Sequence, residues 1–442
     1  MRRAIEAVYF YLLKLFKIQP ETSPNIHRIA SNTSWLVIDN LIRSGMGFFI
    51  GTAIARYLGP EKFGILSYCS AFVVLFSSLA TLGLDSIVIR DVVLEPDRKD
   101  EILGTAFVLK LCGSLLAFVA VVGAISLLKV SEPLIRWLVG VIALSMIFQS
   151  VDVIDYYFQA KVQSKYVVWM RDAAFLIFSV VRIYFICSHA RLECFAYAAL
   201  AEVFCVGVFL FLIYRYRKQS LEVGKFSWAR TKHLFRNCWP GFLSGIAVMI
   251  YMKIDQLILE AFLGNKELGI YVAAIRLLEI AFIPGVILTA TVFPVLLEYK
   301  KQGELFYQEK LKKVYQLLIK ISLGLIVINF MFSKVIISSV YGVQFARSAD
   351  ILSIVIFAAL VVYLGMISGY DILSDGLQKY SFYRTALGAI SSVALNFLLI
   401  PLYGIKGAAW SLIISFLISV FSLGLFRKTR KHFLCLIQSF VR

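Results

Sequence analysis

Six of the charged side chains that lie inside long apolar stretches of this sequence are placed where they could perform chemistry. A charge at the centre of a membrane-spanning helix costs at least about 2.5 kcal/mol and is kept mainly where it faces other protein or a polar cavity. Guanidinium and ammonium groups in such a position can bind a phosphate, and a carboxylate can bind a proton or a cation. The cations are Arg43, Lys253 and Arg276, and the acids are Asp39, Asp255 and Glu279.

Asp39 and Arg43 are four residues apart in the first of these stretches. At this spacing the two side chains lie on one face of a helix, about one turn apart. They could neutralise each other as a structural pair, or they could line a polar cavity. The sequence leaves both interpretations open.

The other four charges lie between 252 and 279, where one apolar helix is followed by another. Lys253 and Asp255 are separated by about 200° around a helix, so only one of them can face a given cleft. Arg276 and Glu279 are only about 60° apart and share a face. We therefore expect Arg276 with Glu279 to form the best-placed site.

The helices that carry these residues are predicted to span a membrane. The chain has 442 residues, of which 60% are hydrophobic and 16% charged, and its mean hydropathy is +0.82. Each crossing needs about 20 apolar residues, and in lipid each must be helical. Twelve stretches qualify: 35–58, 64–84, 102–128, 134–157, 166–187, 194–214, 238–262, 268–297, 314–340, 349–372, 381–400 and 404–426.

The 45 Lys and Arg residues, which give a formal net charge of +18, predict how the chain is oriented. They are concentrated in alternate loops and in both terminal segments, as the positive-inside rule requires of cytoplasmic segments. We therefore expect both termini in the cytoplasm, anionic membrane lipids as partners of the basic loops, and no nucleic-acid partner. Residues 4–18 are apolar but too short to span, and they predict an interfacial helix.

The pattern LGxxxxGI begins at Leu58 and recurs at Leu263, each time between two predicted spans. This repeat predicts an all-α integral membrane protein with twelve transmembrane helices in two six-helix lobes around a central cavity. The expected parts are a cytoplasmic N-terminal segment (1–34), an N-lobe (35–214), a basic linker (215–237), a C-lobe (238–426) and a basic cytoplasmic tail (427–442).

Several motifs together resemble those of the polysaccharide-export family of the multidrug/oligosaccharidyl-lipid/polysaccharide transporters, most closely the O-antigen flippases. They are the two LGxxxxGI tips, DQLIL at 255–259, FQA at 158–160 and NFLLIPLYGIKGAA at 396–409. The resemblance implies a V-shaped fold in the bacterial cytoplasmic membrane that moves undecaprenyl-diphosphate-linked oligosaccharide outward by alternating access. It also implies a polysaccharide polymerase and chain-length machinery as partners.

The resemblance further implies roles for the six charged residues. The diphosphate would be bound by Arg276 and Arg43 first, and then by Lys253. The acids Asp39, Asp255 and Glu279 would be candidates for coupling to H⁺ or Na⁺. We expect no other cofactor and no metal site.

Two alternatives remain. A drug or small-solute antiporter on the same fold would favour carboxylates in its cavity, whereas the interior charges here are mixed. A membrane polysaccharide polymerase would need a large outer loop and a nucleophile with its base, and neither is visible in the sequence. Among the seven cysteines, only Cys187 and Cys194 flank one outer loop closely enough to be considered as a disulfide pair.

Overall fold

The computed structural model describes residues 24–219 and 225–441, and within them every regular element is a helix. The predicted interfacial helix at 4–18 and the side chain of Asp39 lie outside the described part. The helices are α2 (Pro24–Leu75), α3 (Ser77–Thr81), α4 (Asp85–Leu94), α5 (Lys99–Leu128), α6 (Pro133–Phe148), α7 (Val153–Ala160), α8 (Lys165–Cys187), α9 (Leu192–Tyr216), α10 (Trp228–Gln302), α11 (Glu304–Tyr341), α12 (Ser348–Val355), α13 (Phe357–Ser374), α14 (Gln378–Tyr403), α15 (Ile405–Phe421) and α16 (Arg430–Val441), with the short 3-10 turn η4 (Val343–Phe345).

The prediction of a multi-pass helical membrane protein is confirmed. Within the described ranges, eight helices are long and apolar enough to cross a membrane, or nine if the bent pair made by α2 with α3 and α4 counts as one span. The predicted number of twelve is not established by this criterion. It treats α10 as one helix, although α10 contains two of the predicted spans.

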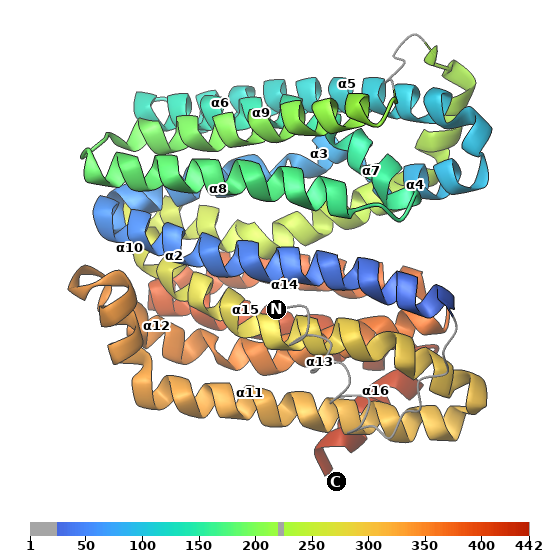
Figure 1. Cartoon of the computed structure of the whole chain (residues 1–442). Helices are drawn as coiled ribbons and strands as arrows, with labels where there is room; N and C mark the ends of the chain where they lie inside the picture. Colours follow the sequence, from blue (N-terminus) through green and yellow to red (C-terminus); the bar gives the residue numbers. More distant parts are fainter. Residues whose placement is uncertain (1–23, 220–224, 442) are drawn as a thin grey trace.

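The two longest helices, α2 and α10, each contain one glycine in a left-handed conformation. Gly59 in α2 has φ 74° and Gly264 in α10 has φ 80°. Glycine adopts such angles readily because it lacks a Cβ atom. Both glycines belong to the repeated LGxxxxGI pattern, and in Figure 1 each helix turns back on itself so that its two segments lie in the same bundle.

The two glycine turns pack against each other. A Cβ atom on Gly64 would lie 1.8 Å from the carbonyl oxygen of Asn265, and one on Gly269 would lie 1.9 Å from that of Pro60. Each contact joins the last glycine of one LGxxxxGI pattern to the residue that follows the first glycine of the other. The repeat is therefore a real structural correspondence. We call this region, residues 59–64 and 264–269, the turn end of the molecule.

The remaining helices are arranged around α2 and α10. In Figure 1 the helices α5, α6, α8 and α9 gather in one part of the bundle, and α11 to α15 gather in the other part. We call α2 to α9 the first half of the molecule and α10 to α16 the second half. The most extensive contact between the two halves is that of α2 with α10. Their buried apolar side chains belong to one continuous core that includes Phe63 and Leu259. The central position of the two helices places any residue on their facing surfaces between the halves.

The described residues of the predicted linker and tail include helix at 228–237 and 430–441. The helix α9 ends at Tyr216 and α10 begins at Trp228, where the hydroxyl of Ser227 accepts a hydrogen bond from the backbone of Arg230 (3.3 Å). Beyond the last predicted span, α16 packs against α11 and α13. Its buried residues share one face and are His432, Cys435, Leu436 and Ser439.

Candidate functional site

A cavity of about 360 Å³ lies between the two halves, enclosed by α2 and α10. Both segments of each helix contribute, because each helix reverses at its glycine turn. The lining residues are Arg43, Ser44, Gly47, Phe48, Ser67, Ser70, Ala71, Val74, Lys253, Gln256, Val272, Ile275, Arg276, Glu279, Ile280 and Ile283. The three predicted cations therefore meet at one place, together with Glu279.

Arg276, in the second segment of α10, reaches across to the other half of the molecule. Its guanidinium carbon lies 5.1 Å from the centre of the Phe63 ring, an arrangement in which the ring face attracts the cation. A Cβ atom on Gly51 would lie 2.2 Å from Nη1 of Arg276. Gly51 thus leaves the space that the guanidinium occupies, a role that the sequence analysis missed.

Arg43 is held by a partner that the sequence analysis did not identify. Its Nε donates a hydrogen bond to Oδ1 of Asp172 in α8 (3.2 Å). The ring of Phe175, one turn further along α8, lies 5.8 Å from its guanidinium carbon. Since Asp172 is itself inside a predicted span, a search for acids within every span would have found it as a candidate.

Lys253 and Glu279 connect the two segments of α10 across the cavity. Nζ of Lys253 lies 3.8 Å from Oε1 of Glu279, and both side chains are partly exposed. The sequence had grouped Glu279 with Arg276 because they share a helix face. Both do line the cavity, but Glu279 forms its ion pair with Lys253.

Asp255 points away from the cavity, as the geometry of the helix requires once Lys253 faces it. Asp255 is buried, and its Oδ2 accepts a hydrogen bond from the hydroxyl of Tyr271 (2.6 Å). Its Oδ1 accepts one from the backbone of Gln256 (2.8 Å). In this conformation Asp255 therefore joins the two segments of α10 and has no place in the cavity lining.

The cavity is cationic and has apolar walls. Three cations face it against one acid, and Phe48, Val74 and several isoleucines complete its surface. Such a lining suits an anionic head group attached to an apolar chain, because guanidinium groups replace the water that an anion loses. No group of three or more His, Cys, Asp or Glu side chains in the described ranges could hold a metal ion.

Two other charges inside predicted spans of the first half have polar partners. Arg182 in α8 donates to Oε2 of Glu202 in α9 (2.6 Å). The buried ammonium of Lys110 donates to the hydroxyl of Tyr156 (2.9 Å), which donates to Oδ1 of Asp85 (2.5 Å). These contacts lie within the first half and away from the cavity lining. Both Cys187 and Cys194 are free thiols.

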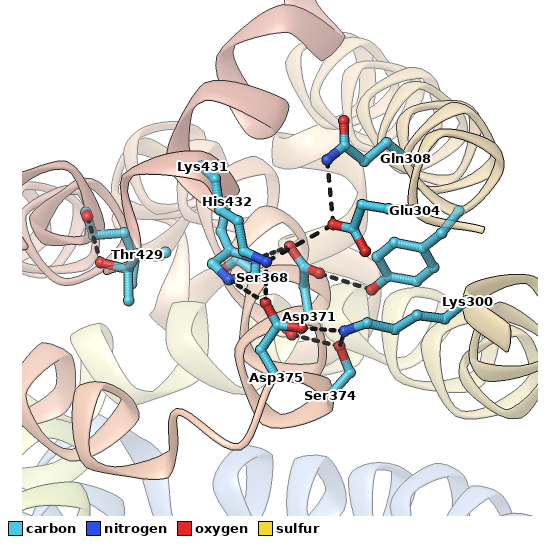
Figure 2. Close-up of polar contacts among 12 residues, drawn as sticks. Lys300, Glu304, Gln308, Ser368, Asp371, Ser374, Asp375, Thr429, Lys431 and His432 are labelled. Atoms are coloured by element: carbon cyan, nitrogen blue, oxygen red, sulfur yellow. Dashed lines mark hydrogen bonds and ion pairs between the residues drawn. The ribbon is translucent and has the colours of Figure 1, made fainter. Parts of the chain in front are cut away.

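A second polar cluster lies where α16 packs onto the second half (Figure 2). Nδ1 of His432 lies 2.6 Å from Oδ2 of Asp371, and its Nε2 lies 3.2 Å from Oδ2 of Asp375. Lys300 and Lys431 both pair with Asp375. Burial raises the pKa of Asp375, but hydrogen bonds from these two lysines outweigh it, so the pKa lies below its usual value.

The fold and the cavity together define the class of protein to which this chain belongs. Two helical halves that enclose a charged cavity between their longest helices have the architecture of a membrane transporter. The chain belongs to the polysaccharide biosynthesis protein family, whose model matches residues 29–300. This match confirms the resemblance drawn from the sequence motifs.

Known proteins agree with this class. Over 410 residues the chain is 24% identical to a Haloferax volcanii protein named "Probable low-salt glycan biosynthesis flippase Agl15", covering 88% of this chain and 82% of the relative. Among solved structures, the lipid II flippase MurJ in an inward closed conformation superposes with a TM-score of 0.73 at 15% identity, covering 91% of this chain and 90% of MurJ. An inward-facing multidrug resistance transporter of the MATE family, MOP superfamily, gives 0.71 at 15% identity over 89% and 96%. At 15% identity, the similarity to these two structures establishes the fold of this chain and nothing further.

Proposed function

We propose that this protein is a flippase for lipid-linked oligosaccharides. It would move an undecaprenyl-diphosphate-linked repeat unit of a surface polysaccharide, such as O-antigen, across the bacterial cytoplasmic membrane by alternating access. The observation that supports this most directly is the convergence of Arg43, Lys253 and Arg276 in one cavity between the halves. The named flippase activities of Agl15 and MurJ support the same class of substrate.

The chemistry of a diphosphate explains the cavity. A diphosphate is a compact and strongly hydrated anion, and it crosses a membrane only if other groups replace its water. Arg276 and Arg43 supply planar donors that can each bind two phosphate oxygens, and Lys253 supplies a third positive charge. The attached glycan and lipid would extend beyond the roughly 360 Å³ of the cavity, between the two halves.

The same geometry weighs against the other functions. A pump for cationic drugs needs a site of net negative charge, whereas three cations here face one acid. An enzyme such as a polymerase needs an activated nucleophile beside a base, and no such pair lines this cavity. We therefore expect transport without chemistry on the glycan, with a polymerase and chain-length machinery acting afterwards as separate partners.

The contacts between the turns suggest the direction of entry. The predicted orientation, in which the basic loops and both termini face the cytoplasm, would put the turn end at the outer surface. The turns are in contact, so the cavity would be loaded from the cytoplasmic side in this conformation. Opening of the turn end would then release the substrate outward. Among the acids predicted to couple transport to H⁺ or Na⁺, Glu279 is in the lining and Asp255 is not; the side chain of Asp39 is outside the described part.

The experiment that tests this proposal is depletion of the protein in its native host. Lipid extracts are analysed for polyprenyl-diphosphate glycans, and a membrane-impermeant glycan-modifying reagent reports which leaflet holds them. We expect one lipid-linked repeat unit to accumulate on the cytoplasmic side and to reach the outer side again when the protein is restored. If no lipid-linked glycan accumulates, the proposal is wrong and the antiporter becomes the better explanation.

A further inference from the structure

A cation inside the second half has no acid beside it. Arg384 lies in α14, near the start of the predicted span 381–400. Among the described residues it forms no ion pair, and the ionisable groups that interact with its charge are Tyr251 in α10 and Tyr315 in α11. Tyrosine is uncharged at neutral pH. The positive charge of Arg384 is therefore not compensated by the side chains around it.

One end of the Arg384 guanidinium group is held by α13. Its Nη1 donates a hydrogen bond to the backbone oxygen of Gly365 (3.1 Å) and another to Oγ of Ser368 (2.9 Å). Both acceptors are neutral, so they orient the guanidinium group without cancelling its charge. This orientation determines where the remaining donors of Arg384 point.

The other edge of the guanidinium group has no acceptor. Its Nε is buried without a hydrogen-bond partner, and Nη2 forms no hydrogen bond with any residue that the structure describes. Nε and Nη2 present two parallel N–H donors, the arrangement with which arginine binds an anion at two points. Nη2 lies beside Gly369, where an added Cβ atom would be 3.5 Å from it. Charged donors inside a membrane-spanning bundle are costly unless a ligand accepts from them.

The next acid along α13 already has other partners. Asp371 lies three residues beyond Ser368, but its Oδ1 accepts a hydrogen bond from the hydroxyl of Tyr307 in α11 (2.7 Å). Its Oδ2 lies 2.6 Å from Nδ1 of His432 in α16 (Figure 2). Both carboxylate oxygens of Asp371 are therefore occupied by α11 and α16 and do not compensate the charge of Arg384.

Another donor without a partner lies close to Arg384. The side chain of Tyr315 is 0% exposed, and its hydroxyl has no hydrogen-bond partner within the described part of the chain. Tyr315 and Arg384 are close enough to interact electrostatically. A hydroxyl can donate one hydrogen bond to an anion. The two N–H groups of Arg384 and this hydroxyl thus form a set of three donors that lacks an acceptor.

We propose that Arg384 binds a chloride ion between α11, α13 and α14. Nε and Nη2 of Arg384 are the main donors, and the hydroxyl of Tyr315 is the third. Chloride is a single atom that is less strongly hydrated than a phosphate, so it suits a small site enclosed by packed helices. The bound ion supplies the negative charge that these helices lack and stabilises their packing.

This chloride site is separate from the cavity between α2 and α10. Neither Arg384 nor Tyr315 lines that cavity. The inference goes beyond the proposed function and does not depend on it, because the site would stabilise the second half whatever the protein transports. Its test therefore uses no glycan, and its failure leaves the flippase proposal untouched.

The test measures the thermal unfolding midpoint of the full-length protein in detergent micelles. Sodium chloride, sodium gluconate and sodium phosphate are compared at equal ionic strength and pH, so that only the anion differs. Chloride should raise the midpoint along a saturating curve, whereas gluconate should not. At a chloride concentration about 100 times the dissociation constant, the ratio of folded to unfolded protein rises about 100-fold. Saturating stabilisation by phosphate but not by chloride would assign the site to an oxyanion and overturn the proposal.

Three substitutions in the site should change the chloride effect. Arg384→Gln should remove it, and in gluconate this variant should be at least as stable as the parent, because no charge is left uncompensated. Arg384→Lys keeps the charge but not the paired donors, so a higher chloride concentration should be needed. Tyr315→Phe should weaken chloride binding severalfold without abolishing it. An unchanged chloride effect in Arg384→Gln would overturn the proposal.

The cavity between α2 and α10 also carries cations, so a control must exclude it as the source of the effect. Arg276→Ala removes one of those cations and should keep the chloride effect; its loss there would assign the effect to the cavity. Crystals grown in sodium bromide locate the ion directly, even if Arg384→Gln does not fold. Anomalous density should appear next to Nε and Nη2 of Arg384. Density for water alone at that position would contradict the assignment.

Discussion

Replacement of Gly64 by alanine tests whether the contact between the two glycine turns determines the conformation. The added Cβ atom would lie 1.8 Å from the carbonyl oxygen of Asn265 and 2.7 Å from its carbon, whereas ordinary contacts begin at about 3.4 Å. Both partners are backbone atoms, so no side-chain rotation can relieve the overlap. The turns would have to separate by a distance on the order of 1.5 Å.

The cost of this separation can be bounded. Overpacking by one methyl group in a well-packed region costs about 1–3 kcal/mol. If this cost falls on the closed form alone, the ratio of closed to open molecules drops by about 5- to 150-fold. We expect Gly64→Ala to shift the distance between spin labels attached at two exposed residues, Val130 in the first half and Val343 in the second, towards the open population. We also expect it to lower the rate of transport, because closure becomes difficult.

Gly45 provides the matched control, because it lies in the same helix and a Cβ atom there would meet nothing within 4 Å. Alanine at Gly45 removes a flexible residue from a helix and should stabilise the protein by about 0.5–1 kcal/mol. The thermal unfolding midpoint and the label distances would be measured for both variants. If Gly64→Ala and Gly45→Ala give the same label distances and unfolding midpoints, the close contact does not determine the conformation.

Three further predictions follow from single contacts. Gly51→Ala should displace the guanidinium of Arg276 and reduce transport at least tenfold with little loss of expression; normal transport would contradict the fit of that side chain. Asp172→Asn should weaken the contact that holds Arg43, and so change the substrate concentration needed for half-maximal transport more than the maximal rate. If that concentration is unchanged, Asp172 does not position Arg43 for binding. The pKa of Asp375 is lowered in the folded protein, so its contribution to stability is present above its ordinary value near 3.8 and is lost as the pH falls below it. Hydrogen exchange in α16 should therefore rise below about pH 4 in the parent, and already at pH 7 in Asp375→Asn; equal exchange in both proteins would exclude this role.

The sequence was sufficient to predict the helical class, the repeat and four of the residues that line the cavity. Apolar length identifies spanning helices, and the cost of a buried charge singles out those that need a partner or a cavity. For that reason Arg43, Lys253 and Arg276, which lie far apart in the chain, could be grouped in advance. Periodicity also predicted that Lys253 and Asp255 would face different ways.

The sequence could not predict which side chains pair across helices. Helical periodicity relates residues within one helix, whereas the ion pair of Arg43 with Asp172 depends on how separate helices are rotated and packed. The same holds for the ion pair of Lys129 with Glu260, whose Nζ and Oε1 atoms are 2.7 Å apart. The close approach at Gly51 was invisible for the same reason. The number of twelve spans is not established by helix length, because the two segments of α10 on either side of the non-helical Gly264 are counted as one helix.

The most direct test of the central claim is transport by an Arg276→Ala variant in cells that lack the parent protein. Arg347→Ala is the matched control, since Arg347 is 61% exposed, pairs with Glu267 and lies outside the cavity. The fraction of lipid-linked oligosaccharide that reaches the outer leaflet would be measured for both at equal amounts of inserted protein. The account predicts loss of this fraction for Arg276→Ala and a normal value for Arg347→Ala. A normal value for Arg276→Ala would contradict the assignment of the cavity as the diphosphate site.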